Sequence, residues 1–251
     1  GDAKMKRMKG WKITGMLLIV TALVCFVRCA VIVMDTGGDM SSFIKTVPEN
    51  KSPKKEKIMT PVDWDKLLAT NADVYAWIRV PGTNIDYPIL QASTGKDDDF
   101  YLHHDIKKNY SFAGCIYTRR ANRKDLSDRL TVLYGHNMIN GSMFGTLRRF
   151  ENEDFFKTHK EFYIYMPQKI LKYRIVAYMI ADDTDILERY QANNELGFEA
   201  YVKELKKARN IRKKEKIKPD DSIVTLSTCD SNSGNRRLLQ GVLRELLTTE
   251  N

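Results

Sequence analysis

Histidine and cysteine are scarce in this chain, which has only four of each in 251 residues. No cluster of metal ligands and no nucleotide-cofactor motif is present, and the chain has no internal repeat. Hydrophobic residues make up 43% of the sequence, too large a share for a mainly disordered chain. The sequence therefore predicts one principal folded domain, with no cofactor and few side chains available for chemistry.

The net charge of +9 is not spread over the chain, so it does not indicate a nucleic-acid partner. Residues 1–12 carry five basic side chains and one acidic one, and residues 203–218 carry nine basic and two acidic ones. The remainder is slightly acidic. We therefore expect no general nucleic-acid face.

An apolar segment, residues 13–34, follows the N-terminal basic residues and is interrupted only by Arg28 near its far end. A helix of this length would measure about 33 Å, enough to span a hydrocarbon core. Basic residues before it and aspartates after it predict a cytoplasmic tail over 1–12, a transmembrane anchor over 13–34 and an extracellular remainder at the cell membrane. The shorter run Ile13–Val27 would also fit a cleaved signal peptide.

Residues 35–59 contain glycine, proline and lysine but few large apolar side chains, which indicates an extracellular stalk. The folded domain is expected over 60–251. Thr60 is a candidate N-cap with Pro61 at the first helical position, so a short helix is expected at the entry to the domain.

Eight later segments are rich in β-formers and are separated by turn residues, which predicts a mainly β domain, either a closed barrel or a sandwich. One long helix interrupts them, with apolar residues from Phe198 to Ala208 at helical spacing. The basic residues at its end indicate either a solvated helix face or contact with an anionic cell-wall polymer. The expected strands are Val74–Val80, Ile85–Leu90, Phe112–Thr118, Leu130–Tyr134, Phe162–Met166, Leu171–Ala181, Ser222–Thr228 and Arg237–Leu246.

Two cysteines, Cys115 and Cys229, lie outside the N-terminal apolar segment. A disulfide between them is the ordinary expectation for an extracellular chain. However, Cys229 ends an apolar, β-branched strand and is followed at once by a polar loop. This placement is typical of a thiol at a strand end that faces solvent or a cleft, although a lone strand cysteine is more often buried and inert.

A cysteine nucleophile needs a base or a cationic partner, because the thiolate is the reactive form. Among the four histidines, His103, His104 and His159 lie in polar or charged surroundings and are expected at the surface. His136 follows an apolar strand and a glycine, so it also emerges at a strand end. From spacing alone, a structural and a catalytic role for His136 are equally supported.

The segment Thr225-Leu-Ser-Thr-Cys229 resembles the TLxTC signature of sortases, and Tyr134-Gly-His-Asn137 resembles the segment that carries their histidine. The order histidine, cysteine, arginine agrees as well. Asn84-Ile-Asp-Tyr-Pro88 and the helix before the cysteine strand are similar to class B sortases. The resemblance implies a closed eight-stranded β-barrel with an N-terminal helix and a long helix before the cysteine strand.

The resemblance also implies site roles. Cys229 is expected to be the nucleophile, His136 the general acid and base, and Arg237 the oxyanion stabiliser, with Arg236 as the alternative because alternate strand residues face opposite sides. Cys115 matches a small buried strand position, which argues against the disulfide. The expected contacts to substrate are Ser227, Asp230, Asn137 and Leu90.

Such an enzyme would cleave the C-terminal sorting signal of secreted proteins after threonine and join them to a peptidoglycan-precursor or cross-bridge amine, or to a pilin lysine. A secreted cysteine hydrolase of the papain kind is an alternative, although those families place cysteine before histidine. A noncatalytic wall-binding domain is another, but it gives no joint reason for His136, Cys229 and Arg237.

Overall fold

The computed structural model describes residues 40–45, 60–190, 194–229 and 234–248, all within the compact unit Gly37–Asn251. The predicted tail and membrane anchor, most of the predicted stalk and Asp230 lie outside the described residues. Among the residues described, no helix is long and apolar enough to cross a membrane.

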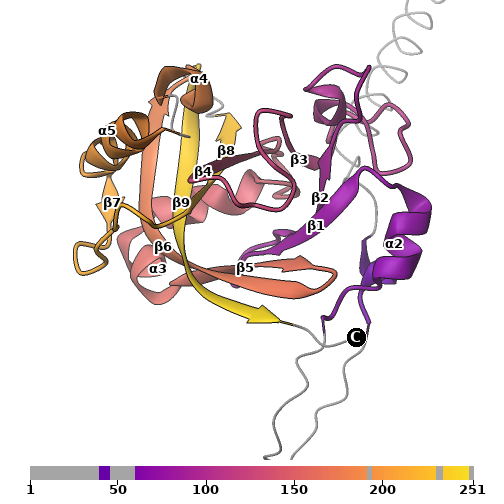
Figure 1. Ribbon diagram of the computed structural model, residues 1–251, viewed down its shortest axis with the longest axis horizontal. Helices are drawn as coiled ribbons and strands as arrows, with labels where there is room; N and C mark the ends of the chain where they lie inside the picture. Colours follow the sequence, from indigo (N-terminus) through magenta and orange to yellow (C-terminus); the bar gives the residue numbers. More distant parts are fainter. Residues whose placement is uncertain (1–39, 46–59, 191–193, 230–233, 249–251) are drawn as a thin grey trace, which may run out of the picture. The chain divides into compact units, whose positions relative to one another are not determined.

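The strands form one sheet that closes on itself (Figure 1). Their order is β5-β1-β2-β3-β4-β8-β9-β6-β7, and β5 also pairs with β6, so eight strands form a ring and the two-residue β7 is attached outside it. The predicted closed eight-stranded barrel is confirmed. The strands are β1 Val74–Arg79, β2 Asp86–Gln91, β3 Ile116–Thr118, β4 Leu130–Tyr134, β5 Glu161–Met166, β6 Lys169–Asp182, β7 Asn210–Ile211, β8 Ile223–Cys229 and β9 Asn235–Thr248.

Most neighbouring strands are antiparallel, but β2–β3 and β4–β8 are parallel. The parallel pair β4–β8 matters most for function, because the carboxyl ends of two parallel strands lie at the same edge of a sheet. Tyr134 at the end of β4 is aligned with Ser227 near the end of β8. The residues that follow the two strands therefore emerge side by side.

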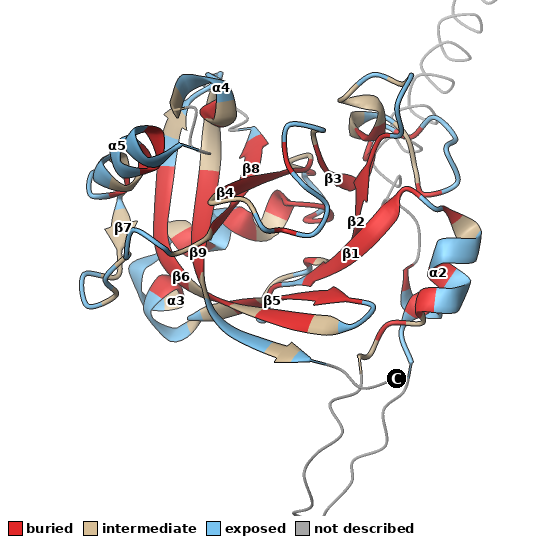
Figure 2. Ribbon diagram, in the orientation of Figure 1, coloured by how far each residue is buried: buried red, intermediate tan, exposed pale blue. Residues whose placement is uncertain are grey.

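The core fills the barrel and continues outward under the covering segments (Figure 2). β8 is buried on both faces up to its last residue, because one face lines the barrel and the other is covered. On the covered face, the hydroxyl of Tyr201 lies 2.8 Å from the hydroxyl of Thr225. Since side chains alternate along a strand, Thr225, Ser227 and Cys229 share this outer face.

Four α-helices are described, α2 Trp64–Thr70, α3 Glu153–Thr158, α4 Ile186–Tyr190 and α5 Glu195–Leu205, with the 3-10 turns η1 Ser41–Phe43, η2 Phe100–Leu102 and η3 Gly145–Glu151.

The predicted N-terminal helix is confirmed as α2, but the prediction that Thr60 caps it is wrong. Asp63 is the N-cap, and its carboxylate accepts from the backbone N–H of Lys66 at 3.4 Å. Thr60 instead accepts a hydrogen bond from the indole N–H of Trp64 at 3.2 Å.

The long helix before the cysteine strand is also confirmed, as α5. It begins at Glu195, where the side chain of Asn194 accepts from the backbone N–H of Gly197. It ends at Leu205, before the predicted limit of Ala208. Its buried face includes Phe198, Tyr201 and Leu205.

Candidate active site

Cys229 is the last residue of β8 and is exposed, whereas Cys115 is buried. Both thiols are free, so the two cysteines form no disulfide and the expectation from the resemblance is correct. Burial raises the pKa of the Cys115 thiol well above its ordinary value, with a further contribution from the charge of Asp105. Of these two cysteines, only Cys229 is accessible to a substrate.

His136 reaches the same edge of the sheet through Gly135, which follows β4 directly. A Cβ added at Gly135 would lie 2.4 Å from the Cδ1 of Ile116 and 2.9 Å from the Cδ2 of Phe144, so a larger residue here would force these two side chains to move. Asn137, the residue after His136, donates its side-chain amide N–H to the carbonyl oxygen of Cys229 at 3.0 Å. The segment that carries the histidine is therefore bonded directly to the residue that carries the thiol.

The imidazole of His136 is half-buried and held on three sides. Its Nε2 lies 2.9 Å from the carbonyl oxygen of Leu102, and the ring stacks on Phe112 with 5.6 Å between centroids and 13° between planes. The ring of His103 lies 5.3 Å away. Because a carbonyl oxygen can only accept, Nε2 carries the hydrogen and Nδ1 is the basic nitrogen of the neutral ring.

The pKa of His136 is lowered from its ordinary value, first because burial disfavours the charged imidazolium and then because His103 and Arg236 repel it. The carbonyl of Leu102 opposes this shift by stabilising the protonated ring. The lowered pKa favours the neutral, basic form of the ring at neutral pH. Such a ring can accept a proton and return it, as general acid–base catalysis requires.

The two candidate arginines differ in their register on β9. Arg236 is paired directly with Cys229, and Arg237 is paired with Thr228. Directly opposed residues of an antiparallel pair project to the same face, so Arg236 lies on the face of Cys229 and Arg237 on the other. This geometry favours Arg236, the alternative in the sequence analysis, over Arg237 as the arginine beside the thiol.

Arg236 forms an ion pair with Asp183, which follows β6. Burial opposes the charge of Arg236, but the hydrogen bond to Asp183 and the nearby Cys229 outweigh burial and raise its pKa. Arg236 therefore remains a permanent cation next to the end of β8. A fixed positive charge of this kind can stabilise an oxyanion that forms near the thiol.

A cavity of about 230 Å³ adjoins this arginine and is lined by Ser227, Arg236, Tyr134 and residues 182–186, which run from the end of β6 to the start of α4. Arg119 contributes to its wall and is held by two 2.7 Å bonds to Asp99 and by an ion pair with Asp185. The cavity is thus a preorganised polar recess beside the edge of the sheet at which Cys229 and His136 emerge, which we call the reactive edge.

The predicted substrate contacts are placed unequally. Ser227 lies at the wall of this cavity although only 2% of it is exposed, and Asn137 is bonded to Cys229. Leu90 is fully buried in β2, so its placement in the core argues against contact with substrate. Asp230 lies outside the described residues.

Sequence reasoning missed several residues of the site. His103 was expected at the surface and is indeed exposed, but it also lies against His136. Phe112 was assigned to a strand, and Arg119 carried no signal at all. Their positions depend on loop geometry, which no local pattern in the sequence encodes. In the described part of the chain, no group of three or more histidine, cysteine, aspartate or glutamate side chains is placed to hold a metal ion.

Comparison with known proteins decides the family. The family profile for the sortase domain matches residues 78–241, more than half of the chain. The chain belongs to the sortase family. Since sortases of this kind are cysteine transpeptidases, this sortase is a transpeptidase.

Among its relatives, this sortase is 34% identical over 184 residues to sortase B of Listeria monocytogenes, covering 70% of this chain and 72% of that protein. The crystal structure of Clostridium perfringens sortase B matches with a TM-score of 0.65 and 34% identity, covering 72% of this chain and 99% of that one. A class B sortase of Streptococcus pyogenes, described as involved in pilus biogenesis, matches with a TM-score of 0.63 and 30% identity, covering 73% and 98%. The resemblance to class B sortases is therefore confirmed.

Proposed function

We propose that this sortase uses Cys229 as the nucleophile, His136 as the general acid and base, and Arg236 as the oxyanion stabiliser. The observation that carries the proposal is the junction at Cys229. The thiol is exposed at a strand end, the segment of His136 is bonded to its carbonyl, and Arg236 is its direct partner on β9.

In the first step, the Cys229 thiolate attacks the carbonyl carbon of a threonine in the substrate peptide, and a C–S bond forms. The carbonyl oxygen becomes an oxyanion beside Arg236, where a preorganised charge in a partly desolvated site stabilises the transition state. His136, which has taken up the thiol proton of Cys229, delivers that proton to the leaving amine nitrogen as the C–N bond breaks. A thioester on Cys229 and a free peptide amine result.

In the second step, neutral His136 accepts a proton from an incoming amine, whose nitrogen attacks the thioester carbon. A new amide forms, the C–S bond breaks, and the Cys229 thiolate is restored. The thioester retains the acyl group in activated form, so the exchange of one amide for another needs no nucleotide and no metal.

The proposed donor is the C-terminal sorting signal of secreted proteins, and the proposed acceptor is an amine of a peptidoglycan precursor or cross-bridge. Residues 13–34 would anchor the chain in the cell membrane with residues 1–12 in the cytoplasm, and residues 35–59 would carry the catalytic domain outside. Hydropathy and the basic residues before the apolar segment support this arrangement.

A second candidate acceptor is the lysine side chain of a pilin subunit. The support for it is the similarity to the Streptococcus pyogenes class B sortase involved in pilus biogenesis. Both acceptors present a primary amine to the same thioester, so they differ in recognition and not in chemistry.

A peptide panel tests the proposal. The full chain in detergent is incubated with peptides that carry threonine in candidate sorting motifs, with either a cross-bridge peptide amine or a lysine peptide. We expect a new amide with one amine and none with Cys229→Ala. Release of the acid alone, with either amine present, would refute the proposed acceptors. Full activity of Cys229→Ala would refute the proposed nucleophile.

A further inference from the structure

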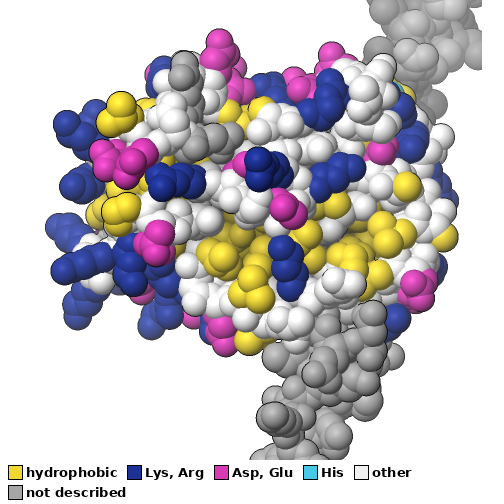
Figure 3. All heavy atoms as spheres, viewed as in Figure 1, with side chains coloured by type: hydrophobic (Ala, Val, Ile, Leu, Met, Phe, Trp, Pro, Cys, Tyr) yellow, Lys and Arg dark blue, Asp and Glu magenta, His cyan; other side chains and the backbone are white. Residues whose placement is uncertain are grey.

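A strip of unneutralised positive charge lies far along the chain from the catalytic residues. We call residues 206–218 the basic ridge; they follow α5, include β7 and lie where Figure 3 shows Lys and Arg side chains gathered at the left edge. Two of its basic side chains are paired, Lys207 with Glu204 and Arg209 with Glu151, each at 2.8 Å. No acidic side chain of the described residues forms an ion pair with the other five exposed lysines, Lys206, Lys213, Lys214, Lys216 and Lys218.

The one acidic residue of the ridge does not neutralise these lysines. Glu215 is engaged by Arg174 at 3.5 Å and by Arg244 at 3.8 Å, two arginines of the barrel strands. The lysine charges therefore face solvent without compensation. Concentrated charge of one sign attracts a partner of the opposite sign.

The ridge is held in a defined conformation. Arg212 donates to the carbonyl oxygens of Ile175 at 3.0 Å and Phe156 at 2.7 Å, and its guanidinium lies over the ring of Phe156. Its backbone N–H also bonds to the carbonyl of Val176 at 2.8 Å. These contacts fix the backbone between Ile211 and Glu215, so the lysines project from an ordered support.

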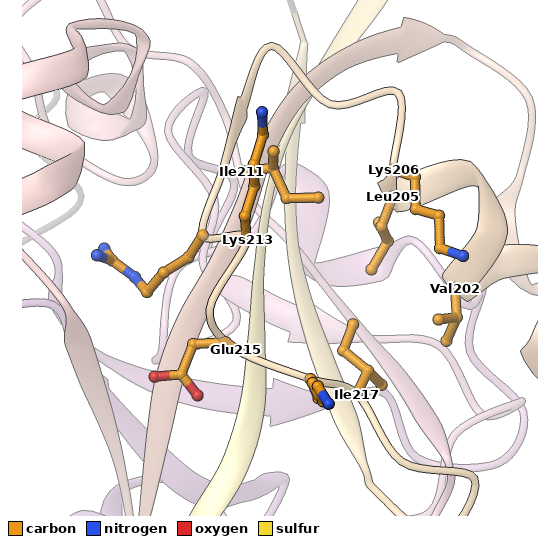
Figure 4. A pocket seen from close by; sticks show the side chains of 9 residues that line it. Val202, Leu205, Lys206, Ile211, Lys213, Glu215 and Ile217 are labelled. Atoms are coloured by element: carbon orange, nitrogen blue, oxygen red, sulfur yellow. The ribbon is translucent and has the colours of Figure 1, made fainter.

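Two hollows flank this backbone. One, of about 520 Å³, lies between α5 and the ridge, where Val202 and Leu205 face Ile211 and Ile217 (Figure 4). The other, of about 730 Å³, lies on the side of α3. Residues 211–213 and Glu215 line both hollows, which therefore adjoin each other. A linear ligand can extend from one hollow to the other and contact the lysines between them.

We propose that the basic ridge binds a linear polyanion with a phosphodiester backbone and no bases, of the polyol-phosphate kind. Lysine ammonium groups act as separate point charges, which suit a flexible row of phosphates better than one planar anion. The ridge contains no aromatic side chain on which a base could stack.

A membrane surface fits this geometry less well. Interfacial segments insert large apolar side chains among the lipids. Within residues 203–218 no large apolar side chain is exposed, since Leu205 is buried and Ile211 and Ile217 are recessed between the lysines.

The ridge is also separate from the reactive edge. Neither hollow shares a lining residue with the cavity beside Arg236. A polyanion bound to the basic ridge can therefore hold the enzyme close to that polymer while the site around Cys229 stays open to substrate.

The test measures binding of the full chain to fluorescent, lipid-free poly(glycerol phosphate) by anisotropy at low and high salt. The test variant is Lys213→Gln/Lys214→Gln/Lys216→Gln. The control variant Lys66→Gln/Lys107→Gln/Lys124→Gln removes the same charge from exposed positions outside the ridge. The basic residues 1–12 are present in both variants, so their contribution cancels.

We expect the ridge variant to weaken binding about tenfold or more and the control variant to weaken it less than about threefold, with both differences lost at high salt. Both variants should cleave peptide as the unmodified chain does, which shows that each is folded. Equal weakening by the two variants, or no binding at low salt, would overturn the proposal. So would binding to phosphatidylglycerol vesicles, lost in the ridge variant, without binding to the free polymer, because the partner would then be a membrane.

Discussion

Replacing Arg236 with glutamine should reduce turnover sharply while leaving the fold nearly intact. The Arg236 side chain is 28% exposed and its partner Asp183 is 59% exposed, so loss of this ion pair should cost about 0–1 kcal/mol of stability. Loss of an oxyanion-stabilising group in a preorganised site typically reduces kcat about 100- to 1000-fold, equivalent to about 2.7–4 kcal/mol. The expected effect on catalysis thus exceeds the effect on stability.

The assay is the steady-state rate of amide formation from a cleavable sorting peptide and an amine, with Cys229→Ala as the baseline. Arg236→Lys should retain part of the activity, because the charge remains but the planar fork is lost. Arg237→Gln is the matched control, one residue along the same strand on the opposite face. We expect it to lower kcat less than about tenfold. Loss of turnover in Arg237→Gln with turnover preserved in Arg236→Gln would refute the role assigned to Arg236.

Three further predictions concern the histidine and its segment. His103→Gln should raise the pKa of His136 by removing a repelling imidazole, as measured by NMR titration; no upward shift would contradict it. Asn137→Ala should lower kcat more than it changes KM and cost about 0.5–1.5 kcal/mol of stability, and unchanged kinetics would argue against its positioning role. Because the pKa of His136 is lower in the folded chain, the contribution of this residue to stability is complete above about pH 6.5 and is lost as the pH falls through the folded pKa. His136→Gln should therefore make the free energy of unfolding, measured by denaturant titration, less sensitive to acid. An unchanged pH dependence would contradict the lowered pKa.

The sequence predicted the bounds of a strand well where the strand is a buried run of β-forming residues that ends at a turn residue. The prediction for β4 has the same bounds as the structure, Leu130–Tyr134, because a short run of buried β-formers is closed by a glycine. The predicted start of β3 at Phe112 was wrong, and the strand begins at Ile116. Gly114 has φ +59 and passes so close to Leu102 that a Cβ would lie 2.2 Å from its carbonyl oxygen, so the chain turns there and leaves Phe112 free to stack on His136.

The sequence predicted which catalytic residues stand at strand ends, but not how the strands β8 and β9 are paired. Cys229 and His136 each follow an apolar strand, so their exposure at strand ends could be expected from the sequence. The choice between Arg236 and Arg237 depends on which residue of β9 faces Cys229, and a shift of one residue exchanges the two faces. Only the pairing of the strands supplies that information.

Mass spectrometry of the enzyme trapped with a sorting peptide, in the absence of amine, tests the central claim most directly. We predict an acyl adduct on the tryptic peptide that contains Cys229, lost when an amine is added and absent from Cys229→Ala. The buried Cys115 provides an internal comparison and should remain unmodified. Amide formation without an adduct on Cys229, or with an adduct on Cys115, would contradict the account.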